Sequence, residues 1–151
     1  MRHLHFGKLL FVVFSLLFAC TVSARKPIKT LLITGQNNHN WQVSHNVLKQ
    51  ILENSGRFEV DFAVSPEQGK DMSGFVLDFS PYQLVVLDYN GDSWPEETNR
   101  RFLEYVQNGG GVVIYHAADN AFSKWPEFNK ICALGGWEGR NENSGPYVYW
   151  Q

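Results

Sequence analysis

The sequence predicts an α/β fold in which helices wrap a mostly parallel sheet. Two continuous apolar runs, Ile28 to Thr34 and Leu84 to Asp88, are typical of strands buried on both faces, as in a parallel sheet. Helical patterns alternate with the strands in the order β-α-β and again β-α-β, which is the arrangement of α/β folds. With 151 residues, 44% of them hydrophobic and 19% charged, the chain fits one folded domain and not a disordered chain.

The first β-α-β unit begins with the strand Ile28 to Thr34, which ends at Gly35. A helix is expected up to about Ser55, with Gly56 as its C-terminal stop. Its apolar residues fall on one helical face, namely Val43, Val47, Leu48, Ile51 and Leu52. Alternation of apolar and polar residues then predicts a half-buried strand near a sheet edge, with Phe58, Val60, Phe62 and Val64 on one side.

The second unit follows a stretch, residues 65–81, whose prolines and glycines predict a loop. After the strand Leu84 to Asp88, Ser93 and Glu96 stand three residues apart and predict a capping box that starts a helix. That helix stops at a Gly-Gly-Gly run before the strand Gly111 to Tyr115. Because the glycines precede a strand instead of joining a strand to a helix, they predict a tight turn and not a phosphate loop.

Residues 1–24 have the features of an export signal, which leaves residues 25–151 as the mature domain. Arg2 and Lys8 precede an apolar run, and small residues follow at positions 22–24. We expect an exported protein, periplasmic or secreted. An uncleaved anchor and a lipoprotein acylated at Cys20 stay open as alternatives. Contact with a membrane is expected only through this signal or that lipid.

Composition excludes several classes of protein. A formal net charge of -2 and the absence of a basic excess exclude a general nucleic-acid binder. Two cysteines cannot form a disulfide-rich scaffold or a cysteine-based zinc module. The cysteine of the mature domain, Cys132, follows Ile131 and is expected to act as a small buried hydrophobe instead of a nucleophile.

Polar and aromatic residues gather where the apolar strands end. Open α/β sheets bind ligands outside the carboxyl ends of their strands, so these residues are candidates for a ligand site. They are Asn37, Asn38 and His39 after the first strand, Asp88, Asn90 and Trp94 after the third, and His116, Asp119, Asn120 and Trp125 after the fourth. Amides and carboxylates hydrogen-bond sugar hydroxyls, and aromatic rings cover the apolar faces of a pyranose. The mixture favours a sugar over a nucleotide.

The catalytic candidates are His116, Asp88 and Asp119. His116 could transfer a proton, and either carboxylate could orient that imidazole or the sugar. Each also has a structural interpretation, as a buried histidine or as a turn or helix cap. His39, His116 and the two acids could in principle bind a metal, but no HExxH spacing occurs and no Gly-x-Ser-x-Gly elbow exists. No metal or cofactor is expected.

Three segments together resemble the ThuA-like family, which is named for bacterial trehalose utilisation. They are LLITGQNNHNW, LVVLDYNGDSWPEE and GGGVVIYHAADNAFSKWPEFNKICALGGW. The resemblance implies a flavodoxin-like fold similar to class I glutamine amidotransferases. In those enzymes a nucleophilic cysteine follows the strand that here ends at Tyr115. This chain has His116 there, so glutamine hydrolysis is not expected.

The resemblance also implies a function and a longer protein. We expect an exported protein of trehalose or related sugar utilisation that acts on, or binds, a sugar derivative; whether it is an enzyme stays open. The alternatives are a non-catalytic carbohydrate- or partner-binding module and an inactive fragment. Family members are longer than this chain, so residues 25–151 are expected to be a ThuA-like domain that is incomplete at its C-terminus.

The intact mass of the protein from its native cells tests the export prediction. A mass equal to that of residues 25–151 is expected, because the small residues at positions 22–24 suit signal peptidase. A lipid-modified mass starting at Cys20 would show the lipoprotein alternative. A mass above the 17.3 kDa of the full chain would show that the reading frame continues past Gln151.

Overall fold

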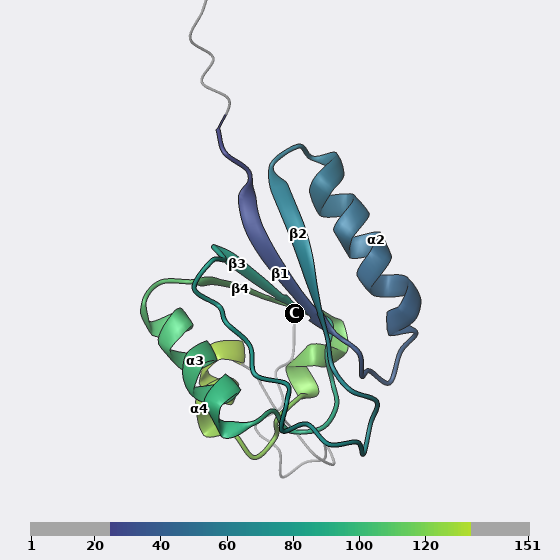
Figure 1. Cartoon of the computed structure of the whole chain (residues 1–151), viewed down its shortest axis with the longest axis vertical. Coiled ribbons are helices and arrows are strands. Elements are labelled where there is room, and N and C mark those ends of the chain that lie inside the picture. The colour runs from purple at the N-terminus through teal and green to yellow at the C-terminus, as the bar shows by residue number, and fades with distance from the viewer. Residues whose placement is uncertain (1–24, 134–151) are drawn as a thin grey trace, which may run out of the picture.

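The computed structural model describes residues 25–133 and shows helices on both sides of a parallel sheet (Figure 1). This arrangement confirms the predicted fold class. In chain order, the elements are β1 (Ile28–Thr34), α2 (Trp41–Asn54), β2 (Phe58–Val64), β3 (Leu84–Leu87), α3 (Glu96–Gln107), β4 (Gly111–Ile114), the 3₁₀ helix η1 (His116–Asn120) and α4 (Pro126–Cys132). No helix within residues 25–133 combines the length and the apolar character that a bilayer crossing needs.

The four strands lie in the order β2-β1-β3-β4, and all neighbouring pairs are parallel. This is the flavodoxin-like order, and it puts β2 at an edge of the sheet, as the sequence predicts. The chain moves from β1 outward to β2 and then returns to β3 on the other side of β1. The order therefore reverses between β1 and β3, and a ligand crevice is expected at the carboxyl ends of these two strands.

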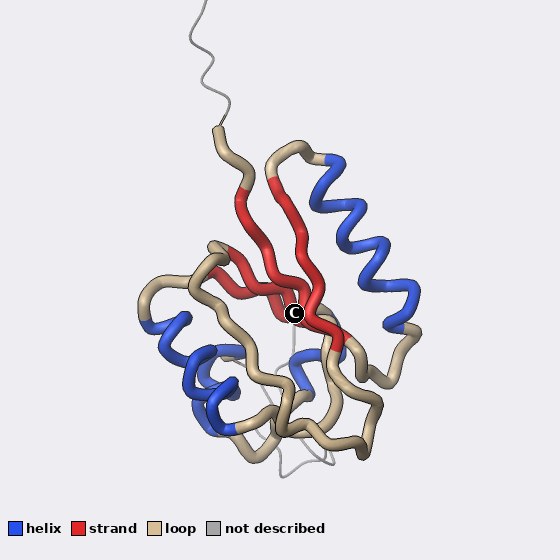
Figure 2. Tube along the Cα trace, viewed as in Figure 1, coloured by secondary structure: helices blue, strands red, loops and turns tan. Residues whose placement is uncertain are grey.

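The two faces of the sheet are covered differently. Among residues 25–133, helix α2 lies on one face, while α3 and α4 lie on the other (Figures 1 and 2). Because side chains alternate along a strand, Leu32 and Val86 face α2, whereas Ile33 and Leu87 face α3. The α3 face carries most of the buried residues, and the α2 face has a smaller apolar cluster.

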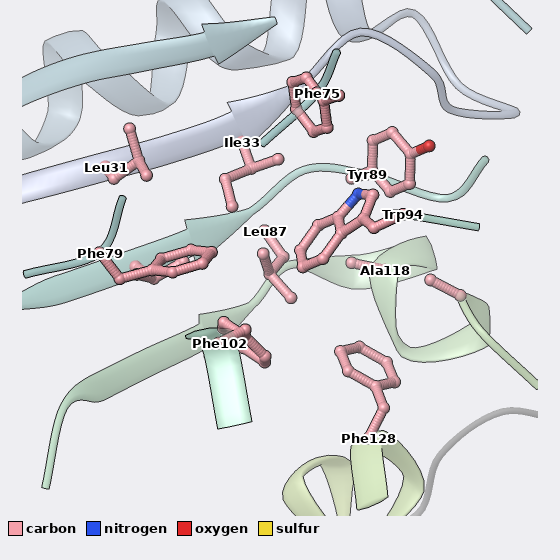
Figure 3. Packing of buried hydrophobic residues seen from close by; sticks show 12 residues of the cluster. Leu31, Ile33, Phe75, Phe79, Leu87, Tyr89, Trp94, Phe102, Ala118 and Phe128 are labelled. Atoms are coloured by element: carbon pink, nitrogen blue, oxygen red, sulfur yellow. The ribbon is translucent and has the colours of Figure 1, made fainter. Parts of the chain in front are cut away.

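Aromatic rings form the centre of the core on the α3 face (Figure 3). Phe102 of α3 is fully buried, and its ring lies 5.7 Å from that of Trp94 and 6.5 Å from that of Phe128, between centroids. Phe122 lies 4.7 Å from Trp94 in an edge-to-face arrangement. Such rings bury large areas and prefer these tilted geometries, so this cluster holds α3 and α4 against the sheet.

The predicted loop between β2 and β3 is confirmed, since it contains neither helix nor strand. It still contributes to the core, because Phe75 and Phe79 are buried with the aromatic cluster. Thr98 of α3 donates a hydrogen bond of 2.7 Å to the carbonyl of Phe75. Two buried rings and this bond fix the loop across the sheet in the place where many α/β folds have a helix.

The apolar face predicted for the first helix is only partly buried. Leu48 and Leu52 pack on the sheet, whereas Val43, Val47 and Ile51 are 55%, 46% and 62% exposed. The prediction that these residues share one face was correct, but the face is wider than the surface that it covers. Phe62 and Val64 of β2 are exposed as well.

The predicted capping box at Ser93 and Glu96 is wrong. Helix α3 begins at Glu96 with Pro95 as its N-cap residue, and no side chain caps it. Pro95 has an extended backbone with ψ of 147°, so the helix cannot begin as early as a Ser93 cap requires. Trp94 instead turns into the core, 3% exposed.

Replacing Phe102 with alanine tests the aromatic core. The variant is expected to lose about 3–5 kcal/mol of unfolding free energy, because a buried ring leaves a cavity among its neighbours. The matched control Val64→Ala, at an exposed strand position, should change stability by less than about 0.5 kcal/mol. Urea unfolding followed by circular dichroism measures both. Equal midpoints for the two variants would contradict this description of the core.

Candidate functional site

A buried glutamine ties together three segments at the carboxyl ends of the strands. Gln36, two residues after the end of β1, donates from its side chain to the carbonyl of Pro66 at 2.8 Å. Its side-chain oxygen accepts from the backbone N–H of Asp92 at 2.7 Å, and its own carbonyl accepts from the backbone N–H of Asn90 at 2.9 Å. The loops after β1, β2 and β3 are therefore held in fixed positions relative to one another.

Two glycines allow close contacts between the strand-end loops, Gly35 against Ser65 and Gly91 against Gln36. Gly35 has a φ of +117°, and a Cβ atom there would lie 2.6 Å from the backbone nitrogen of Ser65. A Cβ atom on Gly91 would lie 2.1 Å from the side-chain oxygen of Gln36. A larger residue at either position would push the strand-end loops apart, since backbone atoms and a buried side chain cannot yield.

Asp88 is the buried acid of the site. It follows β3, is 1% exposed, and both of its carboxylate oxygens are engaged. One accepts from the side-chain amide of Asn37 at 3.0 Å, and the other accepts from the hydroxyl of Ser44 at 2.5 Å. The amide oxygen of Asn37 in turn accepts from the backbone N–H of His39 at 3.0 Å. Asp88 thus orients the loop that carries His39.

Two exposed histidines lie side by side above this acid. The ring centroids of His39 and His116 are 4.6 Å apart, with an angle of 36° between the ring planes. His116 follows β4 and has a φ of +50°, a left-handed conformation that is uncommon for a residue with a side chain. Such a conformation costs about 1–3 kcal/mol and is found most often at functional sites.

These residues line a single pocket of about 450 Å³. Its polar end contains Asn37, His39, Asp88 and His116, together with Ser44. Its other end is apolar and contains Val43, Val47 and Ile51 of α2. A volume of this size is within the range of small-molecule sites, and the pocket lies at the strand ends where the topology predicts a ligand crevice.

Other predicted ligand residues line a second hollow of about 630 Å³. Asn90, Asn120 and Trp125 contribute to it, and it shares no lining residue with the first. The side-chain amide of Asn90 is 3.4 Å from the amide oxygen of Asn38, which places Asn38 between the two hollows. Trp125 is half-buried, with its ring stacked on that of Phe128 at 5.7 Å.

The structure does not bring Trp94 or Asp119 to either pocket. Trp94 is a core residue, so its ring face is covered by other aromatic residues instead of being open to a sugar. The charge of Asp119 instead affects Cys132. Burial is the main cause that raises the pKa of this thiol, to about 11, and the charge of Asp119 adds to the effect. Cys132 packs against the core as expected, and a thiol with this pKa is a poor nucleophile at neutral pH.

A third hollow, of about 570 Å³, lies away from the carboxyl ends of the strands, and its arginines are paired with acids of the same helix. It includes Arg100 and Arg101, but both guanidinium groups are paired with Glu97, and Arg100 is also paired with Glu104. The two arginines lower the pKa of Glu97 to about 2. The pairing satisfies the cations within the helix.

The chemistry available in the first pocket is proton transfer and hydrogen bonding. Imidazole is a common proton-transfer group in proteins, and Asn37 and Ser44 add hydrogen-bonding groups that Asp88 holds in place. Among residues 25–133, no group of three histidine, cysteine, aspartate or glutamate side chains is close enough to hold a metal ion.

Sequence reasoning missed Gln36 and Ser44 as site residues. Gln36 belongs to the polar run after β1, but nothing in that run distinguishes it from its neighbours. Ser44 lies in the first turn of α2, 44 residues before its partner Asp88. Only the fold brings such pairs together, so a single sequence contains no local signal for them.

Comparison with known proteins gives two results. The ThuA family model, described as trehalose utilisation, matches residues 29–147. The crystal structure of a ThuA-like protein from Parabacteroides merdae ATCC 43184 is 95% identical in sequence, with a TM-score of 0.78. That match covers 83% of this chain but 45% of the solved chain, so this chain spans less than half of that protein's length. No curated protein matches the sequence.

The fold and the family match agree over the same residues. The matched range, 29–147, begins at the second residue of β1 and includes the rest of the described strands and helices, together with all of the strand-end residues discussed above. It amounts to more than half of the sequence. The chain therefore belongs to the ThuA family.

Proposed function

We propose that this chain belongs to an exported protein of bacterial sugar utilisation that acts on a sugar derivative at the carboxyl ends of its strands. The observation that carries the proposal is the pair of exposed histidines, His39 and His116, placed 4.6 Å apart at the mouth of a pocket. The description of the family, trehalose utilisation, supports trehalose or a related sugar as the substrate class. The export signal proposed for residues 1–24 lies outside the described residues.

In this proposal His116 is the catalytic residue that moves a proton to or from the sugar. Its imidazole lies at the pocket mouth because the chain turns sharply after β4. His39, whose ring is its neighbour, takes the opposite proton-transfer role, so that one histidine acts as a base while the other acts as an acid. Asn37 binds a sugar hydroxyl while Asp88 positions it from behind.

A second candidate function is binding of a carbohydrate or partner without catalysis, and the second hollow favours it. Asn90 and Asn120 offer amides, and the half-buried ring of Trp125 lies beside them. Amides with an adjacent indole suit the hydroxyls and the apolar face of a pyranose. In this case titration with trehalose gives saturable binding and no product, and truncation of Trp125 to alanine weakens that binding.

Replacing His116 with asparagine separates catalysis from binding. Asparagine tolerates the left-handed backbone at this position but cannot exchange a proton near neutral pH. Turnover of trehalose or a related disaccharide should fall by a factor of about 10² to 10⁴, with sugar affinity largely retained. The matched control is His45→Asn, because His45 lies on α2 against Phe62 and outside the pocket.

Product formation followed by chromatography, together with calorimetric titration, measures the two effects. If His116→Asn and His45→Asn have the same turnover as the unaltered chain, the catalytic role of His116 is wrong. Binding without any product in the unaltered chain would favour the second candidate function.

Replacing Asp88 with asparagine tests its positioning role. Asp88 now accepts hydrogen bonds from Asn37 and Ser44. In the variant, the NH₂ group of the new asparagine would face one of these two donors. We expect a loss of about 2–3 kcal/mol in unfolding free energy and a displaced His39 ring. The control Asp61→Asn removes an exposed ion pair with Lys29 at 3.8 Å and should cost less than about 1 kcal/mol. Urea unfolding and the NMR shifts of the imidazole protons report both effects; unmoved His39 resonances would contradict the prediction.

A further inference from the structure

The first pocket and the second hollow are built from the same two loops. The loop after β3 supplies Asp88 to the first pocket and Asn90 to the second hollow. The 3₁₀ helix η1 begins at His116, which lines the first pocket, and ends at Asn120, which lines the second hollow. The two hollows are therefore held in a fixed relation to each other.

The two hollows are separated by a pair of side chains and not by backbone. The side-chain amide of Asn90 is 3.4 Å from the amide oxygen of Asn38, which is a long and exposed hydrogen bond. The five residues of η1 extend over about 10 Å, a length comparable with that of a disaccharide. A ligand of two sugar units that lies along η1 would thus reach from one hollow into the other.

The wall of the second hollow contains an acceptor whose hydrogen bond is not made within the chain. Asn99, in the first turn of α3, lines this hollow. Its side-chain oxygen is buried and has no hydrogen-bond partner among residues 25–133. Because no described residue holds this oxygen, the amide can turn and present either its oxygen or its nitrogen to a ligand hydroxyl. Buried polar groups are normally hydrogen-bonded, so the exception indicates a partner outside the chain.

The rest of the lining favours a neutral ligand with many hydroxyl groups. Asp92 and Lys124 bring one charge of each sign. The carboxylate of Asp92 already accepts from the backbone N–H of Gly69 at 2.6 Å. The half-buried ring of Trp125 adds an aromatic surface beside these polar groups. Balanced charge, amides and an indole suit a pyranose better than an anion or a cation.

We propose that the second hollow is the subsite for the second sugar unit of a ligand that spans both hollows, so that the ligand has at least two units. The inference rests on the proposed function, because the first unit occupies the pocket of His39 and His116. The ring of Trp125 covers the apolar face of the second unit, and Asn99 hydrogen-bonds one of its hydroxyls. The glycosidic bond crosses the side-chain pair that separates the hollows.

Calorimetric titration of the full chain with glucose and with trehalose, maltose and cellobiose tests the proposal. At least one disaccharide is expected to bind about tenfold or more tightly than glucose, because a linked second unit adds its contacts without a second cost of association. In NMR spectra the bound disaccharide should shift the imidazole signals of His39 and His116 and also the indole N–H signal of Trp125. Glucose should shift the imidazole signals alone.

Two variants make the test specific for the second hollow. Asn99→Leu removes the unpaired buried oxygen at similar side-chain size, so stability should not fall. Affinity for the disaccharide should fall by a factor of about 3 to 10, whereas affinity for glucose stays the same. Trp125→Ala should lower the affinity for the disaccharide to that for glucose. The matched control Asn46→Leu lies at an exposed position of α2 that lines neither hollow, and should change neither affinity.

The possible failures of the two proposals differ. The subsite alone is wrong if all three disaccharides bind no more tightly than glucose. It is also wrong if Asn99→Leu and Trp125→Ala, shown by circular dichroism to be folded, bind the disaccharide as the unaltered chain does. If no sugar binds at all, both the subsite and the proposed function are wrong. If a disaccharide shifts the signals of both hollows but yields no product, the subsite is supported and the proposed catalysis is wrong.

Discussion

The arrangement of the candidate site depends on buried polar groups at the point where the strand order reverses. Gln36 holds the loops after β1, β2 and β3 together, and Asp88 holds Asn37 and Ser44. Burying a polar group costs folding free energy unless the group is hydrogen-bonded. In the low dielectric of the interior, these hydrogen bonds also need good geometry. The hydrogen bonds that satisfy Asp88 also position the loop that carries His39.

The strands and the main helices could be predicted from the sequence because their signals are local. Continuous apolar runs identify β1 and β3, and the Gly-Gly-Gly turn after α3 fixes the start of β4. The start of α3 was misplaced because the Ser93–Glu96 spacing is a local pattern. The burial of Trp94 in the core, which is a tertiary interaction, outweighs this local pattern.

The candidate site could be predicted only in part. The rule that ligands bind at strand ends selected Asn37, His39, Asp88 and His116, which the structure places around one pocket. It could not tell that Trp94 points into the core or that Asp119 lies near Cys132, since the direction of a side chain after a strand depends on the turn. The helical stripe of α2 showed which residues share a face, but a stripe has the same pattern whether its own chain or another segment covers it.

The loop between β2 and β3 has a consequence for how this family can vary. It crosses the α3 face without regular structure, and its position is fixed by the buried rings of Phe75 and Phe79 and by hydrogen bonds to residues outside it, among them those with Thr98 and Asp92. In a helix or a strand, an added residue would turn the following side chains to a different face. This segment has no such regular repeat, so residues can be added or removed between Pro66 and Met72 without turning a buried side chain outward. Because Pro66 also receives the bond from Gln36, length changes in this loop can reshape the rim of the strand-end surface while the sheet beneath stays the same.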